Sequence, residues 1–115
     1  DALTNGIARI SRGQKVAYVT DAACTKANCE KILKLAQNAD HLFIEAAFSQ
    51  AHSAIAREKA HLTAPQAGAL AAQAGVGRLT LFHFSPRYAH EPELLTAEAM
   101  AAYAAPQRRL PLPFA

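Results

Sequence analysis

The sequence predicts an α/β fold in which helices flank a sheet. Short apolar stretches of strand length alternate with helical segments in the order β-β-α-β-α-α-β-α, and this alternation is typical of α/β layers. Three of the strand-like stretches are apolar at nearly every position, which predicts strands that are buried on both faces. A chain of 115 residues with 51% hydrophobic and 18% charged residues has the composition of one globular domain.

Four segments are predicted to form the strands of the sheet. Each is short, is rich in β-branched or aromatic residues, and is bounded by polar or turn-forming residues. They cover residues 7–10, 15–19, 41–46 and 78–82. The first two are close enough to form a hairpin, with its turn at Ser11-Arg12-Gly13-Gln14. The small and polar residues 22–27, which follow the second strand, are expected to form a loop.

The helices are expected over residues 28–39, 50–59, 63–75 and from 93 or 96 to 104. Asn28 is the expected N-cap of the first helix, because a side-chain oxygen there accepts a hydrogen bond from the first turn. Thr63 and Gln66 have the spacing of a capping box, and Pro65 lies in the first turn, where a missing N–H costs nothing. Gly75 is a suitable residue to end this helix.

The overall charge points to no particular partner. The chain carries 12 Lys and Arg against 9 Asp and Glu, and a net charge of +3 permits a polyanionic partner without arguing for one. No apolar run approaches the ~18 residues that a membrane-spanning helix needs. No secretory signal is visible either, so we expect a cytoplasmic protein that does not bind membranes. The first residue, Asp1, indicates a fragment or a processed product.

Two cysteines, Cys24 and Cys29, stand five positions apart. This spacing differs from the Cys-x-x-Cys spacing of redox and metal motifs. We expect two reduced thiols, as is usual in cytosolic proteins. A disulfide and a metal-binding pair are the alternatives.

Two apolar strands are followed by residues that can bind a metal. Asp21 comes after the strand that ends at Val19, and His83 comes after the strand that ends at Phe82. Because α/β folds place their chemistry at the ends of strands, one rim of the sheet can hold both ligand types. The alternatives are structural, with Asp21 as a turn or helix cap and His83 as a histidine at the rim of the core.

Three further residues are candidates for the same site. His61 precedes a helix cap, and it is either an ordinary loop histidine or a proton donor on a loop over the site. Arg87 either forms a surface salt bridge or binds phosphate through its two-pronged guanidinium. Glu45 ends an apolar strand, where a carboxylate needs a partner, and it either orients His61 or His83 or caps a loop. Three other histidines have no partner at ligand spacing and are expected on the surface: His41, His52 and His90.

Four segments, taken together and in order, resemble the C-terminal half of ribonuclease Z. They read GQKVAYVTD at 13–21, ADHLFIEAAF at 39–48, HLTA at 61–64 and HFSPRY at 83–88. Ribonuclease Z is an endonuclease of the metallo-β-lactamase fold superfamily that processes the 3′ end of precursor tRNA. The resemblance implies half of an αββα sandwich over residues 1–105. The tail at 106–115 holds three of the six prolines and is expected to be extended. The resemblance also implies a zinc-dependent parent hydrolase that acts on precursor tRNA or a small phosphodiester.

The resemblance assigns a role to each candidate residue. Asp21 matches a catalytic aspartate that bridges two zinc ions, and His83 matches the late histidine that completes the second zinc site. His61 matches the histidine that donates a proton to the leaving group. The zinc pair would activate a hydroxide and neutralise charge in the transition state. The remaining roles are phosphate binding by Arg87 and Ser85, and orientation of the histidines by Glu45.

The chain departs from the ribonuclease Z pattern in three respects. Ile44 stands where the family often has His, and Leu62 replaces a small polar residue. These two changes suggest a relative of ribonuclease Z with a different substrate. The His-x-His-x-Asp-His motif, which belongs to the N-terminal half of the family, is matched by no segment of the chain. Because zinc normally needs about three protein ligands, we expect this chain alone to bind little or no zinc and to be inactive.

The missing N-terminal half is expected to cover one face of the sheet in the parent protein. In the isolated chain that face would be exposed or buried in a homo-oligomer. Two other functions remain open. One is a superfamily hydrolase that acts on a thioester, a lactone or a cyclic nucleotide. The other is a non-catalytic module that self-associates through its alanine-rich helices or its exposed sheet.

Overall fold

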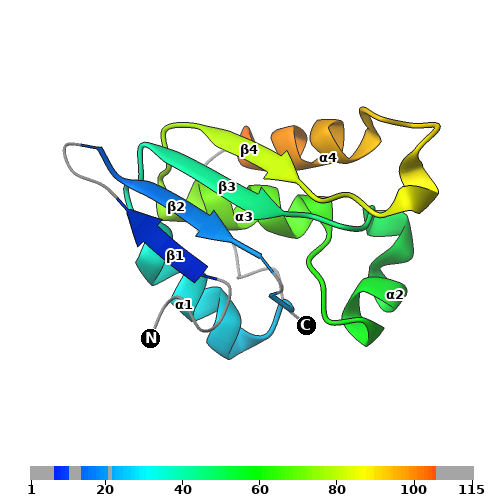
Figure 1. Cartoon of the computed structure of the whole chain (residues 1–115), viewed down its shortest axis with the longest axis horizontal. Helices are drawn as coiled ribbons and strands as arrows, with labels where there is room; N and C mark the ends of the chain where they lie inside the picture. Colours follow the sequence, from blue (N-terminus) through cyan, green and yellow to red (C-terminus); the bar gives the residue numbers. More distant parts are fainter. Residues whose placement is uncertain (1–6, 11–13, 21, 106–115) are drawn as a thin grey trace.

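The sheet has four strands, and three of them are parallel. The computed structural model describes residues 7–10, 14–20 and 22–105. The strands lie in the order β1-β2-β3-β4 and cover Ile7–Ile10, Val16–Val19, His41–Glu45 and Leu79–Phe82. β1 runs antiparallel to β2, whereas β2, β3 and β4 run parallel (Figure 1). The predicted α/β class, the element order and the pairing of the first two strands are confirmed.

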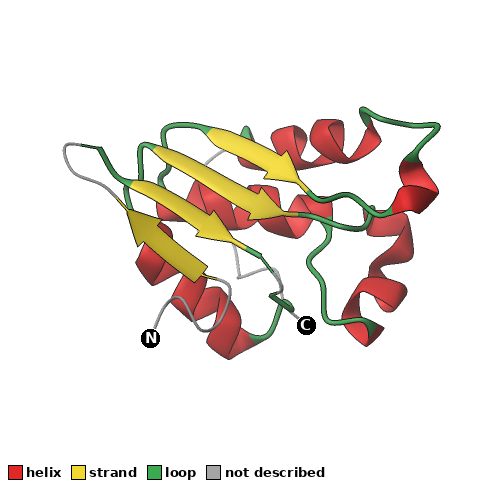
Figure 2. Ribbon diagram, in the orientation of Figure 1, coloured by secondary structure: helices red, strands yellow, loops and turns green. Residues whose placement is uncertain are grey.

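Helices cover one face of this sheet. α1 (Lys26–Ala36) packs against β1 and β2, and α3 (Ala64–Ala74) packs against β3. α4 (Leu94–Tyr103) packs along α3. Figure 2 shows α1, α3 and α4 behind the sheet and α2 (Ser53–Glu58) at one side. Two single turns of 3-10 helix complete the connections, η2 at Gln50–His52 and η3 at Pro86–Tyr88.

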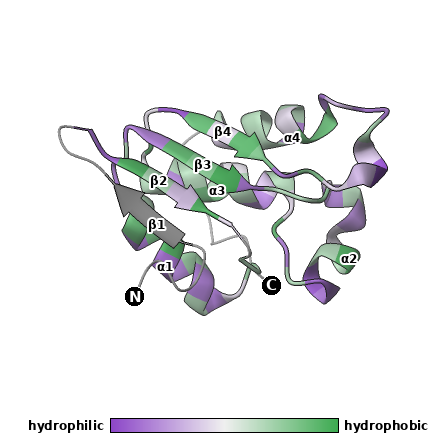
Figure 3. Cartoon of the chain, viewed as in Figure 1, coloured by the Kyte–Doolittle hydropathy of each residue, from purple (hydrophilic) through white to green (hydrophobic). Residues whose placement is uncertain are grey.

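The two faces of the sheet differ in burial. Side chains that point toward the helices are buried: Ala17, Val19, Leu42, Ile44 and Leu79. The alternate positions stay partly or largely exposed, and we call them the open face: Val16, Tyr18, His41, Phe43, Thr80 and Phe82. Figure 3 shows hydrophobic residues along β2, β3 and β4. The prediction of strands buried on both faces is therefore wrong for the chain by itself. An apolar run shows that both sides of a strand are apolar, but it does not show that both sides are covered.

Three rings stack across the open face. The ring centroids of Tyr18 and Phe43 are 4.7 Å apart with an interplanar angle of 12°. Those of Phe43 and His41 are 4.1 Å apart. Nε2 of His41 also lies 2.7 Å from the hydroxyl oxygen of Thr80 on β4. His41 is thus a partly exposed member of a cluster that spans three strands. The expectation that it has no partner is wrong, because Thr80 comes from a different strand, distant in the sequence.

α1 begins earlier than the sequence predicts. Its N-cap is Thr25, whose hydroxyl accepts a hydrogen bond from the backbone N–H of Asn28 over 3.1 Å. Asn28 lies in the first turn instead, and its side-chain amide donates to the carbonyl of Ala23 over 3.0 Å. Both residue types cap helices well, so the sequence alone did not decide between them. The helix ends at Ala36, before Asn38 takes a left-handed φ of 57°.

α3 has the ends that its sequence predicts. Thr63 and Gln66 form a capping box, and Gly75 ends the helix with a left-handed φ of 72°. Gly68 fixes how closely α4 approaches, because a Cβ atom there would lie 2.1 Å from the carbonyl oxygen of Ala99. The helices predicted at 50–59 and near the end of the chain are present with small shifts of their bounds. Residues 11–13 of the turn predicted at 11–14, and the tail at 106–115, lie outside the described residues.

Candidate active site at the ends of the parallel strands

Glu45 is the centre of the candidate site. It is the last residue of β3, it belongs to the same side of the strand as His41 and Phe43, and its side chain is only 3% exposed. A buried carboxylate requires polar partners. Thr20, directly after β2, supplies one of them, because its hydroxyl donates to Oε1 of Glu45 over 2.6 Å. The carboxylate is therefore held between two neighbouring parallel strands.

His61 approaches Glu45 from the end of α2. The helix closes with a left-handed Ala60, at a φ of 60°, and the N–H of His61 donates to the carbonyl of Ala56 over 2.8 Å. This is the arrangement of a Schellman motif, which normally uses glycine at the left-handed position. Nδ1 of His61 lies 2.7 Å from Oε2 of Glu45, an ion-pair distance, although the angles are not those of a hydrogen bond. Glu45 and His61 are thus in direct contact.

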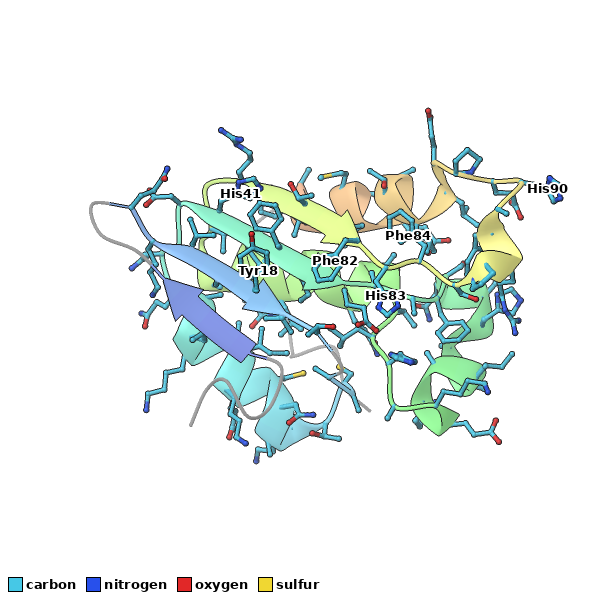
Figure 4. The ribbon with its side chains drawn as sticks, in the orientation of Figure 1. Tyr18, His41, Phe82, His83, Phe84 and His90 are labelled. Atoms are coloured by element: carbon cyan, nitrogen blue, oxygen red, sulfur yellow. The ribbon has the colours of Figure 1, made fainter. Side chains whose placement is uncertain are left out.

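His83 approaches the same carboxylate from the end of β4. Its Nδ1 lies 3.1 Å from Oε1 of Glu45, while 66% of its side chain is exposed. Its backbone has a φ of 62°, a region that non-glycine residues rarely adopt. Figure 4 shows His83 where the chain leaves β4. Because Nδ1 is used by Glu45, Nε2 is the nitrogen that can bind a metal or a substrate.

Arg87 lies over the ring of Phe48. Its guanidinium carbon is 5.4 Å from the ring centroid of Phe48, which is a cation–π distance. The centroid of the same ring is 6.0 Å from that of His61, so Phe48 lies beside both Arg87 and His61. The hydroxyl of Ser85 accepts a long hydrogen bond of 3.4 Å from the N–H of Arg87 and caps η3. In this structure Ser85 therefore shapes the turn that carries Arg87.

A buried network fixes the segment that carries Arg87, and sequence analysis missed it. The hydroxyl of Tyr88 accepts a hydrogen bond of 2.8 Å from the N–H of Ser49, and it lies 2.6 Å from Nδ1 of His52. The hydroxyl of Ser49 donates to Glu98 of α4 over 2.8 Å. His52 is therefore half-buried and bonded, and its prediction as a surface residue is wrong. Tyr88 in the HFSPRY segment was the available signal, since a buried tyrosine needs a partner for its hydroxyl.

The site has the chemistry of a partial metal centre. An imidazole whose Nδ1 contacts a carboxylate is the usual form of a metal-binding histidine, and His83 has this form. Within residues 7–10, 14–20 and 22–105, no group of three or more His, Cys, Asp or Glu side chains has an arrangement that could hold a metal ion. Asp21, the other ligand candidate, lies outside the described residues. The described side chains thus fit one metal ligand and its orienting carboxylate.

Other sequence predictions have simpler outcomes. His90 is exposed, as predicted. Cys24 and Cys29 do not form a disulfide in the described structure, as expected for reduced thiols. Among the described helices, none has the length and apolar character needed to cross a membrane.

Comparisons with known proteins identify the family of the chain. Residues 4–84 match the family described as the beta-lactamase superfamily domain. The chain belongs to the beta-lactamase superfamily. Among the curated relatives of the chain, ribonuclease Z of Thermobifida fusca is 48% identical over 92 residues. The matched region covers 79% of this chain and 28% of that protein.

Solved structures extend the comparison to the fold. The metallo-beta-lactamase fold protein YhfI from Bacillus subtilis has a TM-score of 0.73 and 25% identity, over 85% of this chain and 38% of that one. The short form of human tRNase Z has a TM-score of 0.60 and 31% identity, over 68% of this chain and 29% of that one. The chain thus spans about a third of the length of each of these relatives. The resemblance to ribonuclease Z is confirmed.

Proposed function

We propose that the chain is the C-terminal portion of a zinc-dependent phosphodiesterase that cleaves precursor tRNA at its 3′ end. The observation that carries the proposal is the contact of one buried carboxylate, Glu45, with two histidines from different segments, His61 and His83. The relatives named ribonuclease Z and tRNase Z support this substrate over others of the superfamily. The activity belongs to the longer protein, and this chain supplies one side of its site.

Glu45 is the positioning residue of the proposed site. It holds Nδ1 of His83, and this fixes the direction in which Nε2 points. His83 and Asp21 would be the zinc ligands of this chain, and zinc when bound would activate a hydroxide and stabilise charge on the phosphate. The remaining ligands would come from the N-terminal portion of the longer protein. The isolated chain is therefore expected to hold little or no zinc and to be inactive.

His61 is the proposed proton donor. The carboxylate of Glu45 lies 2.7 Å from Nδ1, so Nε2 is the nitrogen left to face a substrate. The proton for the leaving oxygen would then reside on Nε2. Arg87, placed over Phe48, would bring a permanent positive charge to the phosphate, with Ser85 fixing the turn below it.

A chimera tests the proposal. The segment of Thermobifida fusca ribonuclease Z that matches this chain is replaced by the segment from this chain, and cleavage of a precursor tRNA with a 3′ trailer is measured. We expect the chimera to release the trailer. Glu45→Gln and His61→Ala should lower kcat by about 10²–10⁴-fold. His83→Ala should also lower the zinc content. The matched control is His90→Ala, which removes an exposed histidine outside the site and should change neither quantity.

Three results would overturn the proposal. The first is a folded, zinc-loaded chimera that cleaves no precursor tRNA. The second is a chimera whose Glu45→Gln and His61→Ala variants cleave as fast as the His90→Ala control. The third is hydrolysis of a thioester or lactone without hydrolysis of bis-(p-nitrophenyl) phosphate, which would favour a superfamily hydrolase of small substrates.

The open face supports a second candidate for the chain by itself, a self-associating module. Tyr18 is 41% exposed and stacks on Phe43, so an aromatic surface faces solvent. Light scattering after size exclusion, with and without zinc, measures the mass of the chain in solution. A dimer without zinc that Tyr18→Lys dissociates supports this candidate. A monomer under both conditions excludes it.

A further inference from the structure

The two cysteines lie side by side where α1 begins. Cys24 is in the connection between β2 and α1, and Cys29 is within α1. Their Sγ atoms are 3.3 Å apart. A disulfide has an S–S distance of about 2.0 Å, so the sulfurs need to approach by only about 1.3 Å.

Local hydrogen bonds hold the two sulfurs in this position. Thr25, next to Cys24, caps the helix through its hydroxyl, and its carbonyl accepts from the N–H of Cys29 over 2.8 Å. On the other side of Cys24, the carbonyl of Ala23 accepts from the side chain of Asn28 over 3.0 Å. The connection is therefore tied to the helix on both sides of Cys24, and the short sulfur–sulfur distance follows from the way the helix is capped.

The two thiols have different accessibility. Cys29 is fully buried, whereas Cys24 is partly exposed. The hydrogen bond between the sulfurs lowers the pKa of Cys24, against an opposing effect of burial. The same hydrogen bond, together with burial, raises the pKa of Cys29. Cys24 is accordingly the thiol that an external reagent meets, and Cys29 is the thiol behind it.

A cavity gives access to Cys24. Its volume is about 530 Å³, which lies in the usual range for sites that hold small molecules. Lys26 and Arg57 line it together with Cys24, whereas Asp and Glu are absent from its described lining. Ser53 and Gln66 add neutral polar groups. A cavity with a thiol and two cations suits a small anionic reagent that reacts with sulfur.

We propose that Cys24 and Cys29 form a modification site. A small anionic disulfide of the glutathione type reacts there and oxidises the two thiols to a Cys24–Cys29 disulfide. The thiolate of Cys24 attacks one sulfur of the reagent and displaces one glutathione thiolate. The sulfur of Cys29 loses its proton to solvent, attacks Sγ of Cys24 and displaces the second glutathione thiolate. The cysteine pair loses two electrons, and the reagent is reduced to two thiols.

The position of Lys26 provides a direct test on the 115-residue chain. Trypsin cleaves after Lys15, Lys26 and Lys31, and this separates Cys24 in peptide 16–26 from Cys29 in peptide 27–31. The chain is incubated with glutathione buffers of increasing oxidation, blocked with N-ethylmaleimide and digested. We expect the two peptides to appear as one disulfide-linked species, and the intact chain to become lighter by two hydrogen atoms. Separate, blocked peptides in the most oxidising buffer would overturn the proposal.

Two variants separate the roles of the cysteines. Cys29→Ser should accumulate a mixed disulfide with glutathione at Cys24, because the second step is lost. Cys24→Ser changes the more exposed thiol, so folding is expected to be retained, and Cys29 should react slowly until denaturant is added. Rapid glutathionylation of Cys29 in folded Cys24→Ser would contradict the assignment of Cys24 as the attacking thiol.

A charge variant tests the role of the cavity. Arg57→Gln should slow oxidation by glutathione disulfide several-fold, and it should leave oxidation by the neutral hydroxyethyl disulfide unchanged. The matched control is Lys34→Gln, which removes a cation from the same chain outside the cavity lining. Equal slowing by Arg57→Gln and Lys34→Gln would show that the cavity does not recognise the reagent. None of these measurements depends on nuclease activity.

Discussion

The hydroxyl of Thr20 donates a 2.6 Å hydrogen bond to Oε1 of Glu45. This bond joins the ends of two neighbouring parallel strands at the point where the candidate site begins. It also supplies a donor to a carboxylate that is 3% exposed and that contacts two histidines. Thr20 precedes Asp21 in the sequence, so the bond links the two segments that we expect to carry the ligand and its orienting group.

Thr20→Val tests this bond with almost no change of volume. We expect the variant to lower the free energy of unfolding by about 1.5 kcal/mol, because a buried charged acceptor loses a donor. Urea denaturation of the chain measures it. The control is Thr20→Ser, which keeps the hydroxyl and should retain most of the stability. Equal losses in the two variants would show that the methyl group matters and the hydrogen bond does not.

His83 has a left-handed backbone, and a pair of substitutions isolates its conformational cost. His83→Gly and His83→Ala both remove the imidazole, but glycine tolerates a φ of 62° and alanine does not. We expect the glycine variant to be more stable than the alanine variant by about 1 kcal/mol in urea. At Ala54, in the exposed part of α2, the order should reverse, with alanine more stable than glycine. The same order at both positions would contradict this interpretation.

Gly68 is predicted to be intolerant of any side chain. Gly68→Ala places a Cβ 2.1 Å from the carbonyl oxygen of Ala99, so α3 and α4 must separate. We expect the free energy of unfolding to fall by about 1–3 kcal/mol, although alanine is the better helix former. Gln73→Ala, an exposed change on the same helix, should stay within about 0.5 kcal/mol. A stabilised Gly68→Ala chain would mean that the helices pack more loosely.

His41 should make the stability of the chain depend on pH. Burial, and then the positive charge of Arg78, lower the pKa of His41 below its usual value of 6.5. The unfolded chain therefore binds more protons between the folded pKa and 6.5. The contribution of His41 to stability is complete above pH 6.5, and it is lost as the pH falls through the folded pKa. NMR titration of His41 should give a pKa below 6.5, and Arg78→Gln should raise it. A pKa of His41 above 6.5 would contradict the prediction.

The sequence predicts best those features that short spacings determine. Thr63 and Gln66 specify the start of α3 through contacts three positions apart, and the structure contains that capping box. The start of α1 was wrong by a few residues, because Thr25 and Asn28 are both good caps and only the structure decides which one accepts. Local rules fail where two residues compete for the same role.

Contacts between distant segments are less predictable. Glu45 was predicted to orient His61 or His83, and it contacts both, because parallel strands bring their ends to one rim. The roles of these residues in chemistry stay predictions. The sequence contains no signal for the left-handed backbone of His83. A buried tyrosine such as Tyr88 needs a partner, but the sequence does not identify His52 as that partner. The conformation of His83 depends on the direction in which the backbone leaves β4. The bond of His52 depends on a partner that lies 36 positions away in the sequence.

The open face also gives the chain an optical reporter. The chain has three tyrosines and no tryptophan. Tyr88 is buried with its hydroxyl bonded to Ser49, and the hydroxyl of Tyr103 donates to Val76. Tyr18 is the tyrosine that stands exposed, stacked on Phe43. Its intrinsic fluorescence will therefore register the arrival of any partner on that face, without a dye or a mutation.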